Sequence, residues 1–108
     1  MWNIVFLDEA EKDMKSLDSS VRVQVLKGIQ KVAKNPLSAD QGGYGKPLGN
    51  KSGLDLTSLC KIKFRDLGIR VVYKVEIIDT VMRIIVVSAR ADEQAYKEAA
   101  RRREKYGL

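Results

Sequence analysis

Basic side chains alternate with other residues along positions 60–74, which read CKIKFRDLGIRVVYK. Successive side chains of an extended strand point to opposite faces, so Lys61, Lys63 and Arg65 would share one face of such a strand. Solubility does not require a row of one sign, because charges of mixed sign serve it equally well. The row therefore calls for an anionic partner or for another explanation.

Lysine and arginine set the chemistry that is open to this row. They bind phosphate, and because a neighbouring cation disfavours the charged form of a lysine, a cationic cluster can also supply a partly deprotonated amine. The sequence contains no histidine. Acid–base chemistry would have to use Lys, Arg, Tyr, Asp or Glu, which excludes the serine triad and most other histidine-dependent arrangements.

Further residues extend the basic face. If Arg65 and Arg70 lie opposite each other across the turn RDLG, the strand period places Arg70 and Lys74 on the same face as the first row. Arg90 ends a later strand and Tyr96 lies in the first turns of the final helix. Both reach the same region if that helix packs beside the sheet.

Such a set suits RNA cleavage by internal attack of the ribose 2′-hydroxyl. That reaction needs a base, cations to stabilise the phosphorane oxygens, and an acid for the leaving 5′-oxygen. Neither histidine nor a metal ion is obligatory. A Lys-x-Lys strand is, however, more often a solvated surface than an active site. The residues alone leave both interpretations open.

The length and the charge of the chain limit the number of domains and the class of partner. The chain has 108 residues, of which 44% are hydrophobic and 31% charged, so we expect one globular domain over residues 1–108. Lysine and arginine number 20 against 14 for aspartate and glutamate, a formal charge of +6. This balance favours nucleic acid, anionic lipid or an acidic protein as partner.

Cys60 is the single cysteine, which excludes an intramolecular disulfide and fits a reducing compartment. Its place among apolar strand residues indicates a packed thiol, and we expect neither a metal nor a cofactor. No apolar run approaches the roughly 20 residues that span a bilayer, and no signal peptide is recognisable. We expect a soluble, cytoplasmic protein that makes no membrane contact.

Periodicity predicts the elements in the order strand, helix, helix, three strands, helix. A strand over residues 2–7 leads into a helix that begins at Asp8. A second helix begins at Ser19 or Ser20, carries an apolar stripe that includes Val25 and Ile29, and ends at Asn35 before a proline. The glycine-rich residues 36–58 are expected to be a loop.

Three consecutive strands follow, over residues 57–65, 69–76 and 81–90, and their short connections make them antiparallel. The last helix starts at Asp92, which we expect to cap it. The fold class is therefore α+β, with a small antiparallel-dominated sheet, an N-terminal helical hairpin and a C-terminal helix.

Three segments carry a resemblance to a known family: CKIKFRDLGIRVVYKV, MRIIVVSARADEQAYKEAARR and SLDSSVRVQVLKGIQKVAKNP. The sequence resembles the RelE/ParE superfamily of bacterial toxin–antitoxin modules, and in particular its RelE-type mRNA interferases. The resemblance covers most of the chain in element order and is closest over residues 60–102. It implies a RelE-like fold and cleavage of mRNA in the ribosomal A site.

The resemblance also implies site residues and partners. The family's catalytic residues fall on Lys61, Lys63, Arg70, Arg90 and Tyr96, and its RNA-binding residues on Lys61, Lys63, Arg65, Arg70 and Lys74. The implied partners are a cognate antitoxin protein, the ribosome and the mRNA in its A site.

Individual roles follow from that assignment. Lys61 is the candidate general base, with Tyr96 as the alternative base or as a residue that orients the 2′-hydroxyl and stacks on a nucleobase. Lys63, Arg65 and Arg70 would hold the scissile phosphate. Arg90 would stabilise the leaving oxygen electrostatically, because an arginine pKa above 12 makes proton donation difficult.

A ParE-like protein that poisons DNA gyrase by binding, without catalysis, is the alternative function, since it shares the fold and the basic character. The complete set of five catalytic residues favours the nuclease. Two features depart from the RelE pattern: the glycine-rich stretch 40–53, and Asp92 with Glu93 beside a site that is otherwise basic.

Overall fold

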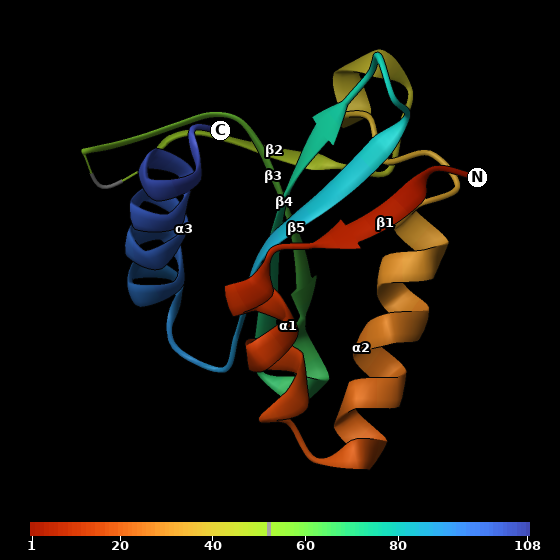
Figure 1. Cartoon of the computed structure of the whole chain (residues 1–108), viewed down its shortest axis with the longest axis vertical. Helices are drawn as coiled ribbons and strands as arrows, with labels where there is room; N and C mark the ends of the chain where they lie inside the picture. Colours follow the sequence, from red (N-terminus) through yellow and green to blue (C-terminus); the bar gives the residue numbers. More distant parts are fainter. Residues whose placement is uncertain (52) are drawn as a thin grey trace.

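The computed structural model describes residues 1–51 and 53–108. Three helices and a five-stranded sheet are formed by these residues (Figure 1). Their order is β1 (Asn3–Phe6), α1 (Asp8–Lys15), α2 (Ser19–Val32), β2 (Lys46–Lys51), β3 (Leu54–Phe64), β4 (Ile69–Glu76), β5 (Val81–Ser88) and α3 (Asp92–Tyr106). The predicted α+β class, with its helical hairpin and C-terminal helix, is confirmed.

The strands lie in the order β1-β5-β4-β3-β2. β1 is parallel to β5, and the other neighbouring pairs are antiparallel. The long connection between β1 and β5, which contains the helical hairpin and the other strands, permits the parallel pairing. The sheet is antiparallel-dominated, as predicted.

α2 and α3 lie on opposite faces of the sheet (Figure 1). On the α2 side, a Cβ atom added to Gly28 would come within 2.2 Å of the ring of Phe64 in β3, so only glycine allows this approach. On the α3 side, the ammonium of Lys61 in the same strand lies 6.0 Å from the ring centroid of Tyr96. The basic face is therefore partly covered by α3 instead of being open to solvent throughout.

The core lies mainly between the sheet and the helices. Val25 and Ile29 of the predicted α2 stripe are fully buried. Tyr73 of β4 is also fully buried, and its hydroxyl donates a hydrogen bond of 2.8 Å to the carbonyl of Pro36. This bond fixes the chain that leaves α2 against the sheet.

The expected loop over residues 36–58 is wrong in part. Residues 46–51 form strand β2, which pairs with β3 from Lys46 opposite Lys61 to Lys51 opposite Leu54. Pro47 and a left-handed Gly49, with a register shift between them, interrupt the alternation that normally reveals a strand. Pairing with β3 supplies the backbone hydrogen bonds that the local sequence does not predict.

The predicted turn between β3 and β4 is also displaced. Arg65 lies in a short 3₁₀ helix (Arg65–Leu67) that follows β3, and Lys63, not Arg65, is opposite Arg70. The last residues paired across the turn are Phe64 and Ile69, one position earlier in each strand than the predicted pair of Arg65 and Arg70. The chain turns at this point because Gly68 adopts the left-handed conformation that ends this helix. Lys61, Lys63 and Arg70 still share a face, since that shift preserves the strand period.

Two smaller boundaries differ as well. β5 ends at Ser88, so Arg90 lies in the connection to α3 and not in the strand. α2 ends at Val32, three residues before the predicted end.

In the described part of the chain, we find no helix with the combination of length and apolar character that crossing a bilayer requires.

Candidate RNA-binding and catalytic site

The β3–β4 ladder places Lys63 and Arg70 directly opposite each other on the face that α3 covers. α3 begins at Asp92, and its carboxylate lies between the two cations. One carboxylate oxygen, Oδ2, accepts a bond of 3.1 Å from the Lys63 ammonium, and the other, Oδ1, accepts one of 2.6 Å from Nε of Arg70. This arrangement is a bidentate anion site that the protein's own carboxylate occupies.

The predicted capping role of Asp92 is wrong. Ala91 is the N-cap residue of α3, and no side chain caps this end. The Asp92 carboxylate instead faces the sheet, where Arg70 and then Lys63 hold its pKa below the ordinary value. The cations therefore bind the carboxylate in its charged form throughout the neutral pH range.

Arg70 is held in place independently of Asp92. Its Nη1 donates to the carbonyl of Gly68 at 3.3 Å and to that of Arg90 at 3.0 Å. The guanidinium thus spans the turn after β3 and the connection after β5. These backbone contacts fix its orientation toward the anion position.

Tyr96 lies one helical turn after Asp92 and on the same side of α3. Only 5% of the residue is exposed, and its hydroxyl has no hydrogen-bond partner among the described residues. Burial, followed by the charge of Asp92, raises the pKa of the phenol, and Lys63 and Arg70 offset this in part. The phenol is therefore held in its neutral form, buried beside the two cations.

Lys61 lies beside this phenol ring, at the 6.0 Å separation given above, which is near the limit of a cation–π contact. The side chain is only partly exposed. Lys61, Lys63, Arg70 and Tyr96 are thus brought together in one region under the first half of α3, with Asp92 among them.

The other predicted residues lie outside this cluster. Arg65 is exposed in the turn after β3. The Lys74 ammonium donates to the carbonyl oxygen of Leu108 at 3.1 Å, at the opposite end of α3 from Asp92. Among the described residues, no hydrogen bond or ion pair joins either residue to Lys63, Arg70 or Asp92.

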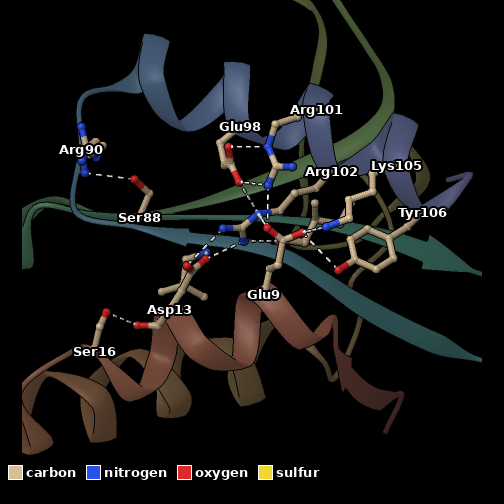
Figure 2. Close-up of polar contacts among 12 residues, drawn as sticks. Glu9, Asp13, Ser16, Ser88, Arg90, Glu98, Arg101, Arg102, Lys105 and Tyr106 are labelled. Carbon is tan, nitrogen blue, oxygen red and sulfur yellow. Dashed lines mark hydrogen bonds and ion pairs between the residues drawn. The ribbon is translucent and has the colours of Figure 1, made fainter.

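Arg90 joins the cluster through its backbone alone, because its carbonyl accepts from Arg70. Its exposed side chain lines a cavity of about 670 Å³ between α1 and α3, together with Ser88 and Gln94. Figure 2 shows Arg90 apart from the other labelled arginines, with its backbone amide bonded to Ser88 at 3.0 Å. In the part of the chain that the structure describes, no hydrogen bond or ion pair joins the Arg90 guanidinium to Lys63, Arg70 or Asp92, so the structure does not bring this predicted side chain into the cluster.

An ion network that sequence analysis missed holds α3 over the sheet (Figure 2). Arg102 is buried and bonds to Asp13 of α1 at 2.7 Å, to Glu98 at 2.6 Å and to the carbonyl of Ile85 at 2.9 Å. The spacing of Glu98 and Arg102 signals a helical ion pair. The contact with Asp13 joins residues 89 positions apart, which no local pattern predicts.

The sequence matches no protein-family model and no curated protein. Solved structures do match. The isolated E. coli RelE toxin is 27% identical, with a TM-score of 0.68 over 94% of this chain and 98% of RelE. A double mutant of E. coli RelE in the free state is 28% identical, with a TM-score of 0.72 over 94% and 96% of the two chains.

The RelBE2 toxin–antitoxin complex of Mycobacterium tuberculosis shares the fold at 21% identity, with a TM-score of 0.59 over 82% of this chain and 98% of the matched chain. The likeness to the two E. coli structures extends over more than nine-tenths of each chain and is accompanied by sequence identities of 27 and 28%. On these grounds the protein is a member of the RelE/ParE toxin superfamily.

Proposed function

We propose that this protein is the toxin of a toxin–antitoxin module and that it cleaves mRNA in the ribosomal A site by attack of a 2′-hydroxyl on the adjacent phosphate. The observation that carries the proposal is the anion site of Lys63 and Arg70, which lies beside Lys61 and Tyr96. Two cations that hold a carboxylate through both its oxygens are equally suited to the two non-bridging oxygens of a phosphodiester.

In the proposed reaction, Lys61 takes the proton of the 2′-hydroxyl as the oxygen attacks phosphorus. The bond to the 5′-oxygen of the next nucleotide breaks, which leaves a 2′,3′-cyclic phosphate and a 5′-hydroxyl end. Lys63 and Arg70 stabilise the charge on the phosphorane oxygens. Arg90 stabilises the leaving oxygen, and solvent supplies its proton.

Tyr96 and the outer cations complete the proposed site. Tyr96 is only 5% exposed, so a nucleobase would stack on its ring only after the side chains that cover the ring, Lys61 among them, have moved. Arg65 and Lys74 would contact phosphates on either side of the scissile one. These contacts would contribute affinity that depends on salt and not on sequence.

We also propose a cognate antitoxin as partner, because E. coli RelE and the M. tuberculosis toxin have been crystallised in complexes with antitoxins. A groove between β1 and the helical hairpin offers a place for it. The groove is lined by Ile4, Val5, Met14 and Leu26, of which Val5 and Leu26 are exposed. The predicted apolar stripe of α2 is buried against the sheet, so it does not form this surface.

The test is cleavage of mRNA on programmed ribosomes, with the ends of the products mapped. Alanine variants of Lys61, Arg70 and Arg90 should each lose about ten- to ten-thousand-fold in rate, as expected for groups that act in the transition state. Lys31→Ala removes the same charge from the exposed side of α2, on the other face of the sheet, and should cleave normally. Intact mRNA together with DNA breaks in intoxicated cells would instead support gyrase as the target.

A further inference from the structure

The anion site of Lys63 and Arg70 is closed by a residue of the protein itself. The Asp92 carboxylate bonds to both cations, and 40% of its side chain remains exposed, whereas the side chains of Lys63 and Arg70 are 25% and 20% exposed. Asp92 is thus the most exposed of the three side chains. An incoming phosphate would approach the cations through the position that this carboxylate fills.

The site would keep its shape after Asp92 leaves. Arg70 remains bonded to the carbonyls of Gly68 and Arg90. Lys63 has no other side-chain partner in residues 1–51 and 53–108, so its ammonium would be free for a ligand. Asp92, in turn, makes no capping bond that its departure would break.

Asp92 also lies near Tyr96, whose pKa its charge helps to raise. The two residues are four positions apart and so share one face of α3. The Tyr96 hydroxyl is buried without a partner among the described residues.

We propose that Asp92 is an internal competitor for the phosphate site: its carboxylate occupies the position of the scissile phosphate in the free protein, and RNA must displace it to bind. This inference rests on the proposed function for the identity of the ligand as RNA. The competition for an anion follows from the contacts of Asp92 with Lys63 and Arg70.

Anion binding tests the competition directly. The full chain is titrated with inorganic phosphate while the Nε–H signal of Arg70 is followed by NMR, and with a 2′-O-methyl RNA oligomer, which cannot react, by fluorescence anisotropy. Asp92→Asn should bind both probes about five- to thirty-fold more tightly than the wild type, since two partly exposed ion pairs no longer compete.

Glu93→Gln is the matched control. It changes the net charge by the same amount at the next residue, but Glu93 is exposed and pairs with Lys97 at 3.3 Å. Its affinity for both probes should change by less than about two-fold, because distant exposed charges are screened. A gain as large as that of Asp92→Asn would show that net charge, and not the local contact, is responsible, and would overturn the proposal.

Two further variants test whether folding or Lys63 accounts for the result. Asp92→Ser also removes the carboxylate and is compatible with a helix start, so it replaces Asp92→Asn if thermal unfolding shows that the latter does not fold. Adding Lys63→Ala to Asp92→Asn should abolish the gain. Unchanged affinity for phosphate in the folded Asp92 variants would refute the competition, whether or not the protein cleaves RNA. Tighter phosphate binding without any cleavage of mRNA would support the competition and refute the proposed function.

Discussion

Replacing Arg102 by methionine tests what holds α3 over the site. Arg102 is only 7% exposed, and its guanidinium bonds to Asp13, to Glu98 and to the carbonyl of Ile85 (Figure 2). Methionine keeps much of the apolar volume of the arginine stem and removes every one of these bonds. The change therefore isolates the ionic contribution to the docking of α3.

The expected loss of stability depends on how deeply the ion pair is buried. Breaking a buried ion pair by removing one partner costs about 3–5 kcal/mol, because the other charge stays behind without compensation. Asp13 would keep its bond of 3.0 Å from the backbone amide of Val87, and 21% of its side chain is exposed. Both features lower the cost, so we expect Arg102→Met to lose about 3 kcal/mol of unfolding free energy.

Urea denaturation measures this loss, which corresponds to a fall of roughly 10–20 °C in melting temperature for a chain of this size. Arg101→Met is the matched control. Arg101 also pairs with two carboxylates, but 48% of its side chain is exposed, so its loss should stay below about 1 kcal/mol. Equal losses in the two variants would refute the assignment of Arg102 as the residue that anchors α3.

Three further outcomes follow from the geometry. Lys63→Ala should reduce the dependence of log affinity for RNA on log salt concentration by about one unit of slope in a salt titration, whereas Lys31→Ala should leave it unchanged. Gly28→Ala should lower the unfolding free energy by about 1–3 kcal/mol in urea, because the new methyl group meets the ring of Phe64; unchanged stability would contradict that contact. Arg70 and Lys63 lower the pKa of Asp92 in the folded protein, so its ion pairs should stabilise the fold above the ordinary aspartate pKa of about 3.9. This stabilisation should be lost as the pH falls through the lower pKa of the folded protein. The difference in unfolding free energy between wild type and Asp92→Asn, measured from pH 2 to 7, should therefore vanish only at the acid end.

The shared face of the three candidate residues Lys61, Lys63 and Arg70 was predictable from the sequence. A strand alternates with a period of two, so an error of one residue in each of two paired strands leaves Lys61, Lys63 and Arg70 on one face. The turn itself was less predictable, because nothing in RDLG indicates that residues 65–67 form a short 3₁₀ helix that Gly68 ends. Arg65 was assigned to the strand for this reason and lies in the turn.

The contacts that define the site depend on tertiary packing. An aspartate at the start of a helix normally indicates a cap, and only the docking of α3 on the sheet brings Asp92 to Lys63 and Arg70 instead. The burial of Tyr96 has the same origin. Strand β2 was missed because its pairing with β3, and not its own composition, stabilises it.

The central claim, attack by a 2′-hydroxyl at the anion site, is tested most directly by an mRNA with one altered sugar. Once the cleavage position on programmed ribosomes is mapped, the ribose immediately before the scissile phosphate is replaced by 2′-deoxyribose. The altered mRNA should bind as the normal one does and resist cleavage at that position, because it lacks the nucleophile. Cleavage of the altered mRNA at the normal rate and position would contradict the mechanism.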